Sequence, residues 1–324
     1  MSKVSVSFHD LHLTVDDLAA DVLSGFSRSQ KSIPPKYFYD AEGSRLFDAI
    51  TELPEYYPTR TETAMLREYA DDIARKAGTG HLLVEPGSGS CAKARILFEG
   101  LQPCAYVPMD ISRDHLQLAA QQVAAEYPWL EVHAACTDFT RLMELPPDSP
   151  EGRRLAFFPG SSIGNFDHEA AVAFLQMIAE MVGPGGQLLI GVDLKKDQAV
   201  FEAAYNDAEG VTAEFNINLL QRINRELGAD FDLAQWQHRA WYNQSLGRIE
   251  MHLVSRREQT VGLLGQTFAF AEGETIHTEN SYKYSVAEFR ALAARAGFAT
   301  DTVWTDAQNL FSLHLLQTGG TDAE

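Results

Sequence analysis

Two glycines after an apolar run are the first sign of chemistry in this chain. The run that begins at His81 ends in an acidic residue, Glu85, and Gly87 and Gly89 follow it. Glycine lets the backbone turn tightly and approach a bound group closely. A helical pattern resumes at Cys91. A strand, a glycine turn and a helix in this order are typical of a site for a nucleotide-bearing cofactor.

The glycine turn by itself leaves the cofactor open. Gly87, Gly89 and Ala92 fit the dinucleotide pattern G-x-G-x-x-G/A. An acidic residue followed by G-x-G also opens the S-adenosylmethionine site of Rossmann-like methyltransferases. An NAD-dependent oxidoreductase and a methyltransferase are therefore both compatible with this segment.

Carboxylates that end the next two strand-like runs extend the candidate site. Asp110 lies about twenty residues beyond the glycines, where a carboxylate accepts hydrogen bonds from ribose hydroxyls. Asp138 and Phe139 follow the third run, where a carboxylate and a ring can hold an adenine base. The alternative for Asp138 is the cap of a following helix. Lys93, on the first turn of the helix, is placed to reach a cofactor carboxylate, and a solvated surface lysine is the alternative.

The elements that would position these residues form an alternating pattern. After His81, strand-like runs alternate with helical patterns, which predicts a parallel sheet wrapped by helices. The segment SVAEFRALAARAGF reads as an amphipathic helix that stops at Gly297, and VWTDAQNLFSLHLLQT reads as two strands around a turn. An antiparallel pair after a parallel sheet resembles the end of class I methyltransferases, and GPGGQLLIGVD resembles that family's entry into its fifth strand.

Two segments remain outside this alternation, and together they predict a second domain. The later one has helical patterns in QAVFEAAYNDAEG, EFNINLLQRINREL and DLAQWQHRAWYN, followed by strand-like runs. We therefore expect an α/β fold: a Rossmann-like core with a mostly parallel sheet and an antiparallel terminal strand, plus a discontinuous α+β substrate domain. The predicted substrate domain comprises residues 1–60 and 196–282, and the predicted cofactor domain comprises residues 61–195 and 283–321.

Composition narrows the class of partner. The 324 residues are 45% hydrophobic and carry a formal charge of −19, which argues against nucleic acid and anionic membranes because both bind through Lys and Arg. A small molecule is expected instead. Three cysteines without metal-ligand spacing suit a reducing cytosol, and neither an apolar leader nor a membrane-length segment is present, so we expect a cytoplasmic protein.

The ten histidines give no prediction of a metal site. His9 and His12 have one-turn helical spacing, and His277 precedes Glu279 on what reads as the same strand face. Three ligands at metal spacing do not occur together in the sequence, so we predict no metal.

Longer blocks identify a family. The chain contains, in order, KSIPPKYFYDAEGSRLFDAITELPEYYPTRTE, VEPGSGS, FFPGSSIGNF, GVDLKKD, AYNDAEGVTAEFNINLL, NRELGADFDL, RIEMHLVS and IHTENSYKY. These blocks closely resemble the histidine-specific Nα-methyltransferases of ergothioneine biosynthesis, nearly from end to end. The resemblance implies that S-adenosylmethionine is the methyl donor and that L-histidine becomes its trimethylated betaine, hercynine. It also implies a methyltransferase core joined to a substrate domain.

The resemblance assigns roles residue by residue. It places the cofactor on Gly87, Lys93, Asp110, Asp138 and Phe139. It places the amino acid on Tyr56, Asn165, Tyr205, Glu279 and Ser281, with Met251 against the side chain. Tyr39 and Phe47, in the matching N-terminal block, are the candidates to stabilise the cation that accumulates, since aromatic faces attract quaternary ammonium groups. Tyr56 or a bound water is the candidate proton acceptor.

Physical chemistry supports the assignment of Glu279 and Ser281. They are two positions apart in a strand-like run, so both project from one face. A carboxylate can accept from one imidazole N–H while a hydroxyl serves the other ring nitrogen. Tryptophan has no second ring nitrogen, so the pair favours histidine. An exposed polar strand edge is the alternative.

Three other candidates each have a structural alternative. Asn165 lies in the loop after the fourth strand, where ligands of open α/β sheets collect, and its amide can both accept from an amine and donate to a carboxylate; a turn asparagine is the alternative. Tyr205 follows Phe201 by one helical turn, so it could be a core aromatic whose hydroxyl finds only water. Tyr56 lies in EYYPT, where Pro58 favours an extended Tyr57.

Pro86 departs from the family pattern, because a larger apolar residue usually stands between the acid and the first glycine. Proline fixes φ and removes one donor, which bears on cofactor affinity. The competing functions are methylation of tryptophan or a related amine, NAD-dependent oxidation, and non-catalytic binding. The expected partner is L-histidine, with no nucleic acid and no membrane. We expect a monomer whose product passes to a separate sulfur-inserting enzyme.

Overall fold

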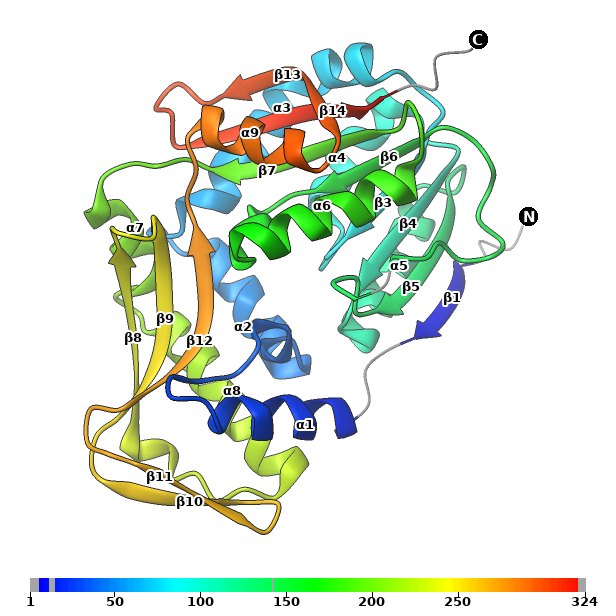
Figure 1. Cartoon of the computed structure of the whole chain (residues 1–324). Helices are drawn as coiled ribbons and strands as arrows, with labels where there is room; N and C mark the ends of the chain where they lie inside the picture. The colour runs from blue at the N-terminus through cyan, green and yellow to red at the C-terminus, as the bar shows by residue number, and fades with distance from the viewer. Residues whose placement is uncertain (1–5, 12–14, 142, 320–324) are drawn as a thin grey trace. The chain divides into compact units, whose positions relative to one another are not determined.

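The chain folds into two compact units. The computed structural model describes residues 6–11, 15–141 and 143–319 (Figure 1). Unit 1 comprises residues 1–12, 58–195 and 283–324, and unit 2 comprises residues 13–57 and 196–282. The division differs from the predicted one at the N-terminus, because residues 6–11 belong to the large sheet and not to the second domain. This strand pairs in parallel with the strand of residues 131–137, far along the chain, so no local pattern could place it.

Unit 1 is built on a mostly parallel sheet. Its strand order is β1-β5-β4-β3-β6-β7-β14-β13. The first six strands in this order run parallel, and β14 and β13 are antiparallel to their neighbours. The predicted α/β fold with an antiparallel end is thereby confirmed. The strands are β1 (Val6–Leu11), β3 (Leu82–Pro86), β4 (Ala105–Asp110), β5 (Glu131–Thr137), β6 (Arg154–Phe158), β7 (Gln187–Asp193), β13 (Phe298–Thr305) and β14 (Phe311–Thr318).

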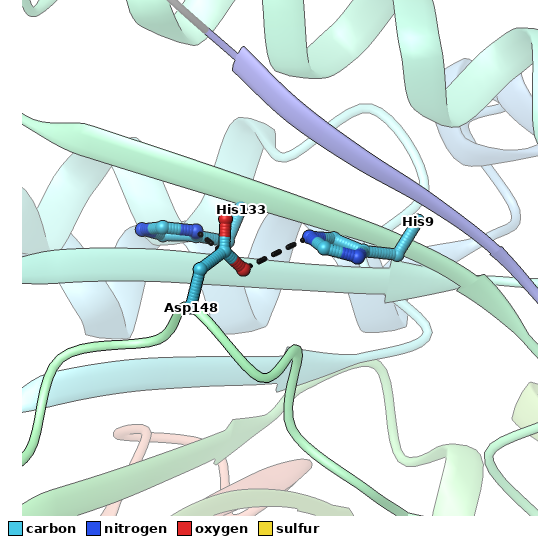
Figure 2. Close-up of side chains that lie close together, drawn as sticks. All are labelled: His9, His133 and Asp148. Carbon is cyan, nitrogen blue, oxygen red and sulfur yellow. Dashed lines mark ion pairs between the residues drawn. The ribbon is translucent and has the colours of Figure 1, made fainter.

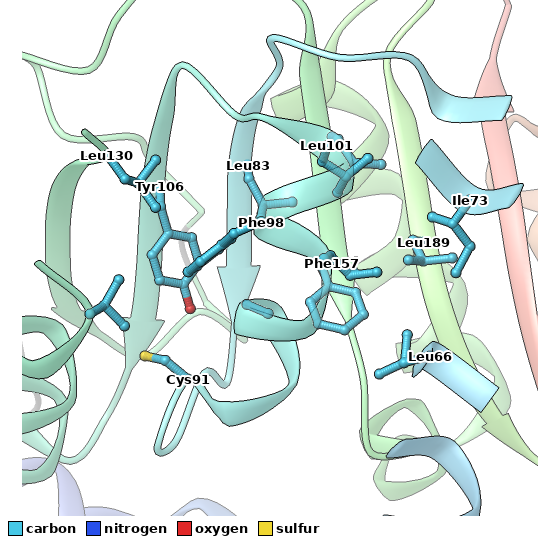
Figure 3. Packing of buried hydrophobic residues seen from close by; sticks show 14 of the residues in the cluster. Leu66, Ile73, Leu83, Cys91, Phe98, Leu101, Tyr106, Leu130, Phe157 and Leu189 are labelled. Atoms are coloured by element: carbon cyan, nitrogen blue, oxygen red, sulfur yellow. The ribbon is translucent and has the colours of Figure 1, made fainter. Parts of the chain in front are cut away.

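Helices cover this sheet and complete its core. The helices are α3 (Tyr57–Ala77), α4 (Ala92–Leu101), α5 (Arg113–Glu126), α6 (His168–Val182) and α9 (Val286–Arg295), with the short 3-10 helix η2 (Ser162–Asn165) after β6. Buried residues of α3, α4 and α5 form one cluster with the central strands, in which Leu66, Phe98 and Tyr106 take part (Figure 3). The helix α6 packs on β6 and β7 and contacts α9. Interior strands of a parallel sheet are buried on both faces, which explains why their sequences are continuous apolar runs.

Unit 2 combines a small sheet with helices. Its sheet has the order β2-β12-β9-β8, and a separate hairpin joins β10 to β11. The strands are β2 (Lys31–Ser32), β8 (Trp236–Asn243), β9 (Arg248–Ser255), β10 (Gln259–Leu263), β11 (Gln266–Phe270) and β12 (Thr275–Tyr282). The helices are α1 (Val15–Phe26), η1 (Pro35–Phe38), α2 (Ala41–Glu52), α7 (Gln198–Tyr205), α8 (Val211–Leu227) and η3 (Leu233–Gln235). The long helix α8 packs on α2, β8 and β9.

One predicted helix of unit 2 is a strand. The segment DLAQWQHRAWYN forms the single turn η3 and then β8, which pairs along its whole length with β9. Its first strand residue, Trp236, packs edge-on against Phe231 and Phe270. Strand pairing and this aromatic cluster therefore override the helical spacing of the sequence.

Two further observations concern the cysteines and the possibility of a membrane-spanning helix. Cys91 and Cys136 are buried, Cys104 is exposed, and all three are free thiols in this structure. Among the described residues, no helix combines the length and the apolar character needed to cross a membrane.

Candidate cofactor and substrate sites

The glycine turn between β3 and α4 has the backbone that the sequence predicted. Gly87 and Gly89 have φ values of +69° and +50°, and Cys91, the residue before α4, is left-handed at +58°. A β-carbon on Gly87 would lie 3.3 Å from Cζ of Phe139. Only glycine therefore suits both the conformation and the close approach of this ring. Phe139 itself lies against the aromatic rings of Phe158 and Phe174.

Asp110 connects the glycine turn to the end of β4. Its carboxylate accepts the backbone N–H of Gly89 at 2.9 Å and that of Ser112 at 2.9 Å. Burial raises the pKa of Asp110, and these two backbone donors oppose the shift. The carboxylate therefore fixes the turn in addition to any contact with a ligand.

Glu85, at the end of β3, is a buried acid beside the turn. It is 1% exposed, and the Tyr106 hydroxyl donates a hydrogen bond to its carboxylate. Burial raises the pKa of Glu85 to about 8, although Tyr106 and Lys93 act in the opposite direction. Burial also raises the pKa of the Cys91 thiol to about 12, so this cysteine is not a nucleophile near neutral pH.

The titration of Glu85 predicts a pH dependence of stability. Its pKa rises from an ordinary 4.5 to about 8 on folding, so between these values the folded protein keeps a proton that the unfolded chain releases. We expect the free energy of unfolding to fall with rising pH in this window, by about 3–5 kcal/mol in total, relative to Glu85→Gln. Denaturant unfolding of both proteins at pH 5, 6.5, 8 and 9 measures this difference. A difference that stays constant across the series would contradict the shifted pKa.

Lys93 has a buried partner that the sequence did not reveal. Its Nζ lies 2.5 Å from Oε2 of Glu62 on α3, and the Glu62 side chain has no exposed surface. The backbone N–H of Gly160 donates to both Glu62 oxygens, at 3.0 and 2.9 Å. A β-carbon on Gly191 would lie only 1.9 Å from Oε1 of Glu62, so β7 needs glycine there. The alternative of a solvated surface lysine is wrong for Lys93.

The sequence of α3 contains a signal for the burial of Glu62. Pro58, Glu62, Met65 and Leu66 are buried at helical spacing on α3, so the carboxylate occupies a position of the apolar face. A charged residue on such a face is buried only with a partner. The identity of that partner depends on the tertiary fold.

Asp138 does not cap a helix. It follows β5, and its carboxylate accepts the backbone N–H of Thr140 at 3.1 Å within a turn. The guanidinium of Arg141 lies 3.5 Å from the same carboxylate. In the described part of the loop to β6 no helix forms, so the capping alternative is wrong.

The predicted cofactor residues come together at one edge of the sheet. Gly87 follows β3, Asp110 ends β4 and Asp138 follows β5, and these three strands are adjacent and parallel. The carboxyl ends of such strands lie along one edge, where open α/β sheets bind ligands. Asn165 ends η2, which follows β6, and it is partly exposed.

The loop that carries Asn165 is anchored by buried groups. The Ser161 hydroxyl accepts the backbone N–H of Asp193 at 2.8 Å. The carboxylate of Asp193 pairs with Nζ of Lys283 at 2.7 Å, and both side chains are 1% exposed. Ser161, Asp193 and Lys283 therefore anchor this loop, and no local sequence pattern predicts their contacts because they lie on three separate segments.

Unit 2 gathers the predicted aromatic residues into a chain of rings. The ring centroids of Tyr39 and Phe47 are 5.7 Å apart, and those of Phe47 and Tyr56 are 6.4 Å apart. Tyr56 and Tyr205 follow at 6.4 Å. The Tyr205 hydroxyl donates to Oγ of Ser281 at 2.8 Å. The interpretation of Tyr205 as a core aromatic whose hydroxyl finds only water is therefore wrong.

Glu279, Met251 and Ser281 lie on the paired strands β12 and β9. Glu279 is directly opposite Met251 in the register, and Ser281 lies two positions farther along β12. Met251 is 2% exposed, Ser281 is 4% exposed and Glu279 is partly exposed. The low exposure of Ser281 is inconsistent with the alternative of an exposed polar edge.

His277 does not share the face of Glu279. The register shifts between these two residues, so His277 is opposite His252 whereas Glu279 is opposite Met251. Neighbouring positions of a strand face opposite sides, which separates the two side chains. The imidazole of His277 stacks on that of His252 at 4.7 Å instead.

A family model described as "Histidine-specific methyltransferase, SAM-dependent" matches residues 18–318. The chain belongs to this family. The identification from sequence blocks is thereby confirmed, and the NAD-dependent oxidoreductase and non-catalytic binding interpretations are set aside. The protein is a methyltransferase that depends on S-adenosylmethionine.

Relatives agree with this identification. A histidine N-alpha-methyltransferase of Mycolicibacterium smegmatis is 43% identical over 92% of this chain and 94% of its own length. Ergothioneine biosynthesis protein 1 of Neurospora crassa is 32% identical over 88% of this chain and 33% of its own length. A 4-dimethylallyltryptophan N-methyltransferase of Claviceps purpurea is 26% identical over 90% of this chain and 92% of its own length.

The residues of this methyltransferase fit a nucleoside cofactor. Both glycines of the turn, Gly87 and Gly89, have positive φ, and a side chain on Gly87 would meet Phe139. A carboxylate, an aromatic ring and an ammonium group lie at the same end of the parallel strands, in Asp110, Phe139 and Lys93. This donor and acceptor set matches the ribose, base and carboxylate of an S-adenosyl amino acid.

Proposed function

We propose that this methyltransferase transfers methyl groups to the α-amino group of L-histidine, and that three transfers give hercynine for ergothioneine biosynthesis. The observation that carries the proposal is the 43% identity, over 92% of the chain, to a protein named histidine N-alpha-methyltransferase. The arrangement of Tyr205, Ser281 and Glu279 in unit 2 supports it with specific chemistry.

The imidazole of histidine matches the two polar groups on β12. The Glu279 carboxylate accepts from one ring N–H. Because Tyr205 donates to Ser281 Oγ, the hydroxyl hydrogen of Ser281 is directed elsewhere, and we assign it to the second ring nitrogen. This arrangement selects one neutral tautomer of the ring. Met251, opposite Glu279, supplies a buried apolar surface beside it.

The α-amino group must lose a proton before it can attack. The amine of a free amino acid is protonated at neutral pH, so the site must provide an acceptor for this proton. We assign the orientation of the amino acid to the Asn165 amide and to Tyr56, with Tyr56 or water receiving the proton. Tyr56 is 9% exposed and lies beside Tyr205, which supports its placement near the substrate.

The cofactor side is assigned to unit 1. S-adenosylmethionine supplies an electrophilic methyl group on a sulfonium, and displacement by the amine forms the C–N bond as the C–S bond breaks. Gly87, Asp110, Asp138 and Phe139 are proposed to hold its nucleoside, and Lys93 its carboxylate. An ammonium has three N–H donors, so Lys93 can bind a ligand while it remains paired with Glu62.

The aromatic chain of unit 2 suits the later methylations. With each transfer the amine loses N–H donors, and the trimethylated product carries a permanent positive charge. Aromatic ring faces attract such a cation. Tyr39 and Phe47 are both partly exposed within their aromatic cluster. We propose that they favour the methylated amine over water.

A direct assay tests the function. We expect purified enzyme with S-adenosylmethionine and L-histidine to give a product that carries three additional methyl groups by mass spectrometry. Tandem fragmentation places them on the α-nitrogen and not on the ring. L-tryptophan and 4-dimethylallyltryptophan are run in parallel, since a relative is named for the latter substrate. Methylation of either tryptophan compound with histidine unchanged would overturn the proposal.

A further inference from the structure

Three potential metal ligands meet on one face of the large sheet, apart from the glycine turn. In the parallel pair of β1 and β5, Ser7 is opposite His133 and His9 is opposite Ala135. Side chains two apart on a strand share a face, so His9 and His133 project from the same side. Asp148, in the loop between β5 and β6, lies over this face (Figure 2).

The ligand atoms already have nearly the spacing of a coordination sphere. Oδ1 of Asp148 lies 3.1 Å from Nε2 of His9 and 3.5 Å from Nδ1 of His133. All three atoms lie within 4.8 Å of one another. Tetrahedral zinc with bonds of about 2.1 Å separates its ligand atoms by about 3.4 Å. The two separations from Asp148 Oδ1, 3.1 and 3.5 Å, are close to this value.

Three of the four imidazole nitrogens are buried and make no hydrogen bond of acceptable geometry within the described protein. His133 is 2% exposed, and neither of its ring nitrogens makes a hydrogen bond of acceptable geometry. Nε2 of His9 is likewise buried without one. Buried polar atoms are nearly always bonded, because leaving one without a partner costs about 1–3 kcal/mol. A cation bound by Nε2 of His9 and Nδ1 of His133 would give both of these atoms a partner.

An outer carboxylate completes the pattern. Oε1 of Glu131 lies 3.2 Å from Nε2 of His133, on the opposite side of the ring from Asp148. Histidines that bind metals commonly direct their second nitrogen to a carboxylate, which fixes the ring and strengthens the ligand.

We propose that His9, His133 and Asp148 bind a divalent transition-metal ion, with zinc as the best match and water as the fourth ligand. Two imidazoles and one carboxylate suit zinc, cobalt or nickel, whereas calcium and magnesium prefer oxygen ligands. His133 precedes Asp138 by five positions, about 17 Å along an extended strand. The ion therefore fastens the edge strand β1 to β5 and to the following loop, and takes no part in methyl transfer.

No local pattern in the sequence predicts this site, and the prediction of no metal followed from the absence of ligands at metal spacing. The helical spacing of His9 and His12 does not apply, because His9 lies on the strand β1; His12 is outside the described residues. The ligands come from three segments that only the β1 and β5 pairing brings together.

Zinc titration of tag-free, chelator-treated protein tests the site. We expect one equivalent of zinc to bind in competition with a chromophoric chelator and to raise the thermal midpoint. Cobalt in place of zinc should give the intense visible bands of a tetrahedral ion. Asp148→Asn keeps the size of the side chain and should lose at least 100-fold in zinc affinity, and Glu131→Gln, an outer-shell change, about 10-fold.

Asp114→Asn is the matched control, because Asp114 is 82% exposed on α5 in the same unit. It should bind zinc like the parent protein. Methylation of histidine should continue in zinc-free protein, which separates this test from that of the proposed function. Absence of zinc binding by the parent, or equal binding by the Asp148→Asn and Asp114→Asn variants, would overturn the proposal and leave a cluster of ion pairs.

Discussion

Glu279→Ala is expected to lower kcat/KM for histidine by roughly 100-fold to 1,000-fold while the Kd for S-adenosylmethionine stays within about twofold. A hydrogen bond to a charged group contributes about 1.5–3 kcal/mol, and each 1.4 kcal/mol is tenfold in rate. Removing the carboxylate also leaves the imidazole N–H without its acceptor in a partly enclosed site, which increases the loss. Steady-state kinetics with both substrates and calorimetry with the cofactor measure the two effects.

The control for this prediction is Glu272→Ala. Glu272 is an exposed glutamate in the same unit, in the turn between β11 and β12. Glu272→Ala should leave both kcat/KM for histidine and the Kd for S-adenosylmethionine unchanged. Glu279→Gln keeps one carbonyl acceptor and should fall between the parent and Glu279→Ala. Equal losses of histidine use and cofactor affinity in Glu279→Ala would mean that Glu279 maintains the fold, and its role in substrate binding would then be wrong.

The sequence predicted the sheet of unit 1 well for a physical reason. Interior parallel strands must be apolar on both faces, so β3, β4 and β7 appear as apolar runs bounded by turns. The edge strand β1 has no such constraint. It alternates apolar and polar residues, from Val6 and Ser7 to Phe8 and His9, and its partner β5 lies far away in sequence. Strand pairing at that separation leaves no local pattern to recognise.

The same limit applies to the candidate sites. Residue types and the family resemblance placed Tyr205 and Ser281 in one site, but their 2.8 Å hydrogen bond depends on how α7 meets β12. The role of Glu62 could not be predicted, because the position of a carboxylate on an apolar helix face does not reveal which residue it pairs with. The bulge in β12 shifts His277 away from Glu279, and alternation along a strand cannot reveal an inserted residue.

Glu62→Gln is expected to reduce the free energy of unfolding by about 3–5 kcal/mol, because it leaves the ammonium of Lys93 without its buried anion. The Glu62 carboxylate serves two kinds of donor, Nζ of Lys93 and the N–H of Gly160. A glutamine has one acceptor end and one donor end, so one of these donors would face an NH₂ group. Denaturant unfolding measures the loss, and cofactor affinity should fall with it because Lys93 loses its orientation.

A control and a double variant make this prediction specific. Glu68→Gln, at an exposed position of the same helix, should change stability by less than about 0.5 kcal/mol. Combining Glu62→Gln with Lys93→Met removes the charge that the single variant leaves unbalanced, so the double variant should be more stable than Glu62→Gln alone. Additive losses would show that Glu62 and Lys93 act independently. If the double variant regains stability but not cofactor affinity, the Glu62–Lys93 pair contributes to folding stability and the Lys93 ammonium contributes to cofactor binding.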